Sequence, residues 1–112
     1  MADAFVLDKK SILERLGGDE DIYAMMVDMY LQDVDNNCAA LDGALQTGDA
    51  DAIRREVHTV KGLLATFSDE SGAAEAQRIE HQARDGEMAG LAAGVVALQE
   101  RLREVAKVLS GG

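Results

Sequence analysis

The chain has 112 residues, 47% of them hydrophobic, and a formal net charge of −10 at pH 7. This length suits one ordinary domain with a buried core, so we expect a single domain over residues 1–112. The hydrophobic content excludes a disordered chain. The strong negative charge argues against nucleic acid or an anionic membrane as the main partner.

Residue preferences favour helices along the whole chain. There is no proline, only 4% of residues are aromatic, and alanine, leucine, glutamate, arginine and methionine dominate. This set forms helices readily and offers little from which to build strands. Glycine, aspartate and serine therefore mark the helix ends. The five helices predicted in chain order span residues 8–16, 19–47, 50–67, 73–84 and 91–109.

Several of these boundaries have local signals. Gly17 and Gly18 close the first helix, Asp19 caps the second, and Gly48 followed by Asp49 stops the second helix and caps the third. The segment SDESG is expected to break the chain before the fourth helix. The last three residues, 110–112, are predicted to form a flexible tail.

The spacing of apolar residues predicts how the helices pack. In the last helix the apolar residues follow a 4-3-4-3-4 spacing, which is a heptad seam of fewer than three heptads. Those residues are Leu91, Val95, Leu98, Leu102, Val105 and Leu109. The stripe predicted for the second helix includes Ile22, Met26, Met29, Tyr30, Val34, Leu41 and Leu45. We therefore predict an all-α fold, an antiparallel four-helix bundle with a short extra N-terminal helix.

The third predicted helix has two distinct faces. With His58 at 0° and about 100° per residue, the apolar side chains fall between roughly 180° and 260°. This core-facing stripe consists of Ile53, Val57, Val60, Leu64 and Phe67. His58 points the opposite way, toward solvent. The side chains around it are cationic or small, namely Arg54, Arg55, Lys61, Gly62, Ala65 and Thr66.

This face suits nucleophilic chemistry. An exposed imidazole offers a ring nitrogen as nucleophile, and neighbouring cations would stabilise a phosphoryl group attached to it. Gly62 is expensive in a helix interior, where glycine costs roughly 1 kcal/mol relative to alanine. It leaves a clearing through which another protein could reach the ring. No glycine-rich phosphate loop or carboxylate cluster for magnesium lies beside His58 in the sequence, so a partner must supply that machinery.

The sequence resembles the histidine-containing phosphotransfer (HPt) domains of two-component phosphorelays. Their signature is H-x-x-K-G, which His58, Lys61 and Gly62 match. The stretch TGDADAIRREVHTVKG looks like the family's approach to the histidine. A second signature, AxxIExxARxG, is seen at residues 76–86. The resemblance covers nearly the whole chain, although the family usually has glycine where Ser68 stands.

The resemblance implies a phosphorelay intermediate that is not a stand-alone catalyst. His58 would accept a phosphoryl group on Nε2 from the aspartate of one response-regulator receiver domain and pass it to another. Lys61 would help offset the phosphoryl charge, and Gly62 would make room for the receiver. No cofactor is expected on this chain, because Mg²⁺ belongs to the partner receiver. The other residues expected to contact the receiver are Arg54, Arg55, Ala65 and Thr66.

Other interpretations remain open at this stage. The chain could be an HPt-like adaptor that binds a receiver or a hybrid histidine kinase without being phosphorylated, or the phosphotransfer domain of a chemotaxis-type kinase. A metal-binding bundle would require Glu-x-x-His pairs. Arginine lies three residues before both His58 and His81, so neither histidine belongs to such a pair. Methionines 25, 26 and 29 are interpreted as core filler and not as soft metal ligands. Cys38, the only cysteine, is expected to lie in or near the core.

The expected setting follows from the same features. A single cysteine allows no internal disulfide, which favours a reducing compartment. The apolar run at residues 4–7 is too short for a signal peptide or a membrane span. We therefore expect a cytoplasmic monomer with no metal site and no membrane or nucleic-acid partner.

Overall fold

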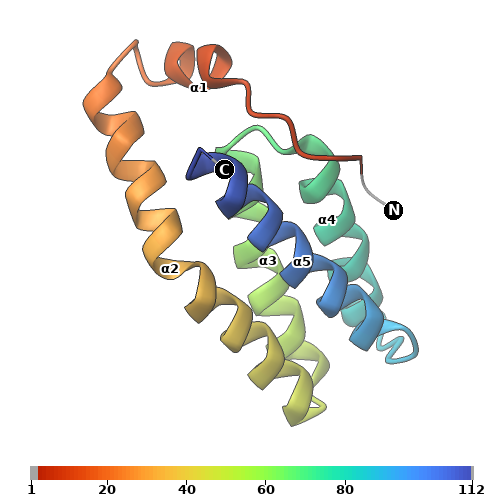
Figure 1. Cartoon of the computed structure of the whole chain (residues 1–112). Helices are drawn as coiled ribbons and strands as arrows, with labels where there is room; N and C mark the ends of the chain where they lie inside the picture. Colours follow the sequence, from red (N-terminus) through yellow and green to blue (C-terminus); the bar gives the residue numbers. More distant parts are fainter. Residues whose placement is uncertain (1–2, 112) are drawn as a thin grey trace.

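The computed structural model describes residues 3–111, and every regular element in that range is a helix. The five helices are α1 (Lys9–Arg15), α2 (Glu20–Thr47), α3 (Ala50–Thr66), α4 (Glu70–Arg84) and α5 (Leu91–Leu109). Helices α2 to α5 form the bundle, and the short α1 lies across one end of it (Figure 1). The predicted all-α bundle with an extra N-terminal helix is confirmed.

Aspartates begin four of the helices. Asp8, Asp19, Asp49 and Asp69 each accept a hydrogen bond on the side chain from a backbone N–H in the first turn. Such caps satisfy N–H groups that have no partner inside the helix, and a carboxylate also suits the positive end of the helix dipole. The cap at Asp69 corrects one prediction. The segment SDESG does not break the chain as far as residue 72, because Asp69 accepts from the Gly72 N–H and α4 already begins at Glu70.

The core lies along the bundle axis and follows the predicted stripes in α3 and α5. Its largest fully buried side chains are Phe67, Ile12, Leu41, Ile53, Leu64, Ile79, Leu91, Leu98, Leu102, Val57, Val60 and Val95. Tyr30 packs edge-on against Phe67 and donates a hydrogen bond from its hydroxyl to the Leu102 carbonyl. Cys38 is buried, as expected.

The predicted stripe of α2 is wrong at Ile22 and Met29, and the interpretation of Met25 as core filler is wrong as well. The side chains of Ile22, Met25 and Met29 are exposed, with Met25 at 63% and Met29 at 60%. Only Met26 is partly buried against the core. The first turns of α2 therefore carry exposed apolar side chains beside the buried Tyr23 and Tyr30. The methionines are therefore partly a surface feature and not simply core filler.

A glycine sets the spacing between α4 and α5. A Cβ placed on Gly94 would lie 3.0 Å from two carbons of the fully buried Ile79. The backbone of α5 thus approaches α4 more closely than a larger residue would allow. Gly94 therefore serves packing, in addition to weakening the first turns of α5.

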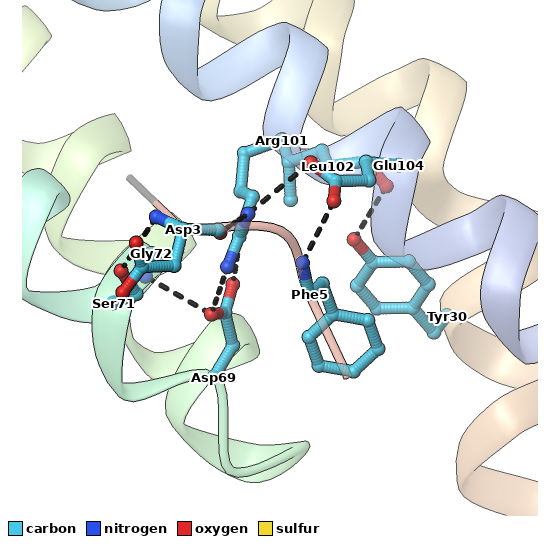
Figure 2. A network of polar contacts seen from close by, with 9 residues as sticks. All are labelled: Asp3, Phe5, Tyr30, Asp69, Ser71, Gly72, Arg101, Leu102 and Glu104. Atoms are coloured by element: carbon cyan, nitrogen blue, oxygen red, sulfur yellow. Dashed lines mark hydrogen bonds and ion pairs between the residues drawn. The ribbon is translucent and has the colours of Figure 1, made fainter. Parts of the chain in front are cut away.

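A buried ion pair joins the start of α4 to α5. Arg101 donates two hydrogen bonds to Asp69, at 2.6 and 2.8 Å, and both side chains are almost fully buried. Figure 2 shows that the N-terminal segment crosses over this pair. Arg101 also donates to the Asp3 carbonyl, and the Phe5 N–H donates to Glu104 at 2.7 Å. We call residues 3–8 the N-terminal strap.

Two residues of the predicted flexible tail, Ser110 and Gly111, lie in the described part of the chain. The Ser110 N–H donates to the Ala106 carbonyl and the Gly111 N–H to the Val108 carbonyl, directly after the end of α5 at Leu109. Gly112, the last residue of the predicted tail, lies outside the described residues. None of the described helices has the length and apolar character needed to cross a membrane.

Candidate functional site

His58 lies in the middle of α3 on the side facing away from the core. The apolar residues of the opposite face (Ile53, Val57, Val60 and Leu64) are at most 1% exposed. Burial of this stripe fixes the rotation of α3 about its axis. The His58 side chain is consequently 64% exposed, which leaves the imidazole accessible to another protein.

Glu80 of α4 contacts both His58 and Lys61 of α3. Its Oε2 lies 2.9 Å from His58 Nδ1, and its Oε1 lies 2.9 Å from Lys61 Nζ. An ionised carboxylate can only accept hydrogen bonds, so Nδ1 carries the proton in this pair. In the neutral ring the unprotonated nitrogen is then Nε2. The contact with the carboxylate therefore leaves Nε2 as the ring nitrogen with a free lone pair.

The environment of Glu80 keeps its carboxyl ionised. The side chain is only 14% exposed, and burial by itself would raise its pKa. The hydrogen bonds from Lys61 and His58, together with the positive charge of Lys61, outweigh that effect and hold the pKa of the Glu80 carboxyl below its ordinary value. A charged acceptor therefore stands behind the imidazole at neutral pH.

Glu80 also changes the predicted charge of the site. The sequence indicates a cationic surround, but Lys61 is paired with Glu80, and Arg54 lies 3.7 Å from Asp51 of its own helix. Arg55 is exposed on the same helix. In the sequence, Glu80 is evident only as a position of the AxxIExxARxG signature. Its role required knowing which face of α4 meets α3.

The clearing beside His58 is open. Gly62 is exposed, and a Cβ placed on it would meet no atom within 4 Å outside its own helical surroundings. Ala65, one turn further along, is exposed as well. The Thr66 hydroxyl donates to the Gly62 carbonyl at 2.9 Å, so this side chain folds back on its own helix. Toward the C-terminal end of α3, no large side chain of this helix therefore projects beside the imidazole.

An apolar groove borders this surface on the side of α2. It has a volume of about 170 Å³ and is lined by Met26, Met29, Tyr30, Asp33, Leu63, Thr66 and Phe67. Thr66 lines the groove and is hydrogen-bonded to Gly62 of the clearing, so the two are adjacent. Of the two exposed methionines of α2, Met29 lines the groove. The sequence did not predict this groove, because periodicity cannot distinguish a core stripe from an uncovered apolar one.

Nothing in this arrangement resembles a metal centre. Among residues 3–111, no group of three His, Cys, Asp or Glu side chains is placed to hold a metal ion. His81 follows Glu80 on α4, and its side chain is exposed. The two histidines therefore do not form a shared site with other metal-binding side chains.

Comparisons with known proteins show the family to which the chain belongs. A family model described as Hpt domain matches residues 25–108, which is more than half of the chain. A search of the curated proteins found no match. The structure is similar to the crystal structure of histidine-containing phosphotransfer protein B (HptB) from Pseudomonas aeruginosa PAO1, with a TM-score of 0.84 and 26% identity, covering 97% of this chain and 95% of that chain. The chain therefore belongs to the Hpt domain family, whose members carry phosphoryl groups on histidine in phosphorelays.

Proposed function

We propose that this protein is a relay intermediate between two receiver domains, with His58 as the residue that carries the phosphoryl group. The observation that supports this most directly is the 2.9 Å contact between His58 Nδ1 and Glu80, which leaves Nε2 unprotonated on an exposed ring. Nε2 attacks the phosphorus of a receiver's aspartyl phosphate. The Nε2–P bond forms as the bond from phosphorus to the aspartate oxygen breaks, and the aspartate leaves as a carboxylate. The reverse step delivers the group to the second receiver.

The neighbouring side chains assist this exchange in two ways. Glu80 accepts a hydrogen bond from the Nδ1–H of His58, and its negative charge stabilises the ring when Nε2 becomes bonded to phosphorus. Lys61, hydrogen-bonded to the same carboxylate, provides positive charge near the incoming phosphoryl oxygens. The Mg²⁺ ion that neutralises the phosphoryl group during transfer belongs to the receiver and not to this chain. The protein accordingly does not catalyse the exchange alone.

The docking surface that we propose is centred on His58. It includes the clearing at Gly62 and Ala65, the flanking Arg54 and Arg55, and the apolar groove between α2 and α3. Transient complexes of this type bury less than about 1,200 Å² in total. We propose that the protein binds as a monomer to one receiver at a time, in the cytoplasm, and that a hybrid histidine kinase can supply the first receiver.

Label transfer tests the function directly. Phosphorylated receivers from the same organism should label the protein, and the product should be acid-labile and alkali-stable, as an N–P bond is. His58→Gln should abolish labelling without changing the helical circular dichroism, since the side chain is exposed. Label that persists in this variant would assign the site to His81 or to an aspartate. Receiver binding without labelling of the parent protein would instead support the adaptor interpretation.

A matched pair of glycine variants tests the clearing. Gly62→Gln and Gly43→Gln make the same change at two exposed helix positions where an added Cβ meets no atom within 4 Å. Only Gly62 lies beside His58, so only this variant should slow transfer from a receiver, by at least about tenfold. A small donor such as phosphoramidate should label His58 equally in both. Equal rates of receiver transfer in the two variants would refute the steric role.

A second pair tests the role of Glu80. In Glu80→Gln the charge that fixes the Nδ1 proton is lost, so the proportion of the Nε2-protonated ring should rise in ¹⁵N NMR spectra of His58. Transfer should slow in parallel. Glu87→Gln, an exposed position between α4 and α5, is the control. An unchanged tautomer ratio in Glu80→Gln would show that the carboxylate does not orient the imidazole.

A further inference from the structure

The C-terminal end of α3 has an unusual residue at its turning point. Phe67 caps the helix, and Ser68 follows with a φ of 59°, in the left-handed region. The Ser68 N–H donates to the Ala65 carbonyl and the Asp69 N–H to the Leu64 carbonyl. These two bonds define a Schellman ending, in which the left-handed position is usually glycine. Ser68 is the only non-glycine residue with positive φ among those that the structure describes.

A contact from α1 accompanies this strained serine. The Nη2 atom of Arg15 donates at 2.8 Å to the Ser68 hydroxyl oxygen and at 2.8 Å to the Thr66 carbonyl. Glycine at position 68 would suit the backbone better but could not accept the first of these bonds. A non-glycine residue in the left-handed region costs on the order of 1 kcal/mol or more. The Ser68 hydroxyl therefore serves the hydrogen bond with Arg15, and backbone conformation does not explain the serine.

The position of α1 depends on a few contacts. The helix has seven residues, too few to be stable alone, so packing must hold it. Ile12 is its single fully buried side chain, and Arg15 makes the polar contact with the end of α3. Loss of the bond to Ser68 would leave Arg15 with the Thr66 carbonyl alone. The C-terminal end of α1 would then be held less firmly.

This end of α1 borders the surface that His58 occupies. A groove of about 300 Å³ is lined by Ser11, Arg15, Ala65, Ser68, Glu70 and Ala73. Ala65 lies seven residues after His58 on α3, which corresponds to about 10 Å along the helix. A footprint of about 600 Å² on each partner is equivalent to a disc about 14 Å in radius. A receiver centred on His58 therefore reaches Ala65 and the edge of α1.

We propose that Ser68 and Arg15 are positioning residues that hold α1 as one wall of the receiver-docking surface. This inference rests on the proposed relay function and adds a feature that the phosphorylated histidine itself does not require. Held in place, the wall contributes contacts without an ordering cost when the receiver docks. With the hydrogen bond removed, docking has to order α1 and weakens. The chemistry at His58 stays the same, because neither residue contacts the imidazole.

Ser68→Gly gives a test in which stability and docking change in opposite directions. Glycine relieves the positive φ, so the variant should melt at the same temperature as the parent protein or higher. The receiver concentration that gives half-maximal transfer should nevertheless rise by about fivefold, as expected for loss of one hydrogen bond. The maximal transfer rate and labelling by phosphoramidate should not change. A merely structural serine would show the gain in stability without the loss in docking.

Two further variants complete the experiment. Arg15→Gln should raise the half-maximal concentration at least as much as Ser68→Gly, and the double variant should be no worse than Arg15→Gln, because both changes remove the same contact. Lys10→Gln, an exposed position on α1, is the control for lost charge. If the parent protein transfers and all variants saturate at its receiver concentration, the inference is wrong and the relay function stands. If the parent protein accepts no label from any receiver, the relay function itself fails.

Discussion

The buried pair of Arg101 and Asp69 allows a quantitative prediction about stability. Arg101→Met keeps much of the side-chain volume but removes both hydrogen bonds to Asp69, which is 3% exposed. Removing one member of a buried pair typically costs about 3 to 5 kcal/mol, because the remaining charge is left without its partner. Asp69 would keep the Gly72 N–H and the favourable end of the α4 dipole, so we expect the lower limit, about 3 kcal/mol. For a chain of this length that corresponds to a fall of about 13 °C in melting temperature.

The assay is urea unfolding followed by circular dichroism, together with thermal melts. Arg103→Met makes the same chemical change two residues along α5 at an exposed position, and should cost less than about 0.5 kcal/mol. Adding Asp69→Asn to Arg101→Met should recover part of the loss, because it removes the orphaned charge. If Arg101→Met and Arg103→Met differed by less than about 1 kcal/mol, the buried pair would not be a determinant of stability.

Three other predictions concern a glycine contact, a titration and a thiol. Gly72→Ala should destabilise the protein by at least about 2 kcal/mol in urea unfolding, because its Cβ would clash with the Asp69 carboxylate. Gly43→Ala, where an added Cβ meets no atom within 4 Å, should instead stabilise it by up to about 1 kcal/mol. The lowered pKa of Glu80 stabilises the folded state at pH values above 4.5, the ordinary pKa of the carboxyl, and this contribution is lost as the pH falls through the pKa of the folded state. The difference in unfolding free energy between the parent protein and Glu80→Gln should therefore shrink on acidification. A difference that stays constant with pH would contradict the lowered pKa. Burial raises the pKa of the Cys38 thiol, so a disulfide reagent at pH 8 should modify it at least about a hundredfold more slowly than in urea, and equal rates would show that the core opens freely.

Periodicity predicted the features of the fold that depend on one helix at a time. The stripe on α3 determined which way His58 points, since an apolar face about 100° wide has one stable orientation against a core. The same reasoning failed for Met25 and Met29, because an apolar stripe looks alike whether or not another helix covers it. The predicted start of α4 was also wrong: the segment SDESG was expected to break the chain, whereas Asp69 caps a helix that begins at Glu70.

The candidate site divides in a similar way. His58, Lys61 and Gly62 lie within five residues of one another, so a motif on one helix was enough to group them. Glu80 is 22 residues from His58, and its contact depends on how α4 packs against α3. Arg15 is 53 residues from Ser68, and the two meet only through the placement of α1. Neither contact has a local sequence signal, because Glu80 and Arg15 lie on helices other than α3, whose residues they contact.

The N-terminal strap has a consequence for how the protein is synthesised. The Phe5 N–H and its acceptor Glu104 are separated by 99 residues, and Arg101, which binds the Asp3 carbonyl, lies in α5. At about 5 to 20 residues per second, the strap residues are synthesised roughly 5 to 20 seconds before these partners. During that interval the apolar ring of Phe5 lacks the α5 residues beside which it lies in the folded domain. The synthesis of α5, and not the emergence of the histidine-bearing helix, is therefore the event that allows the strap to join the bundle.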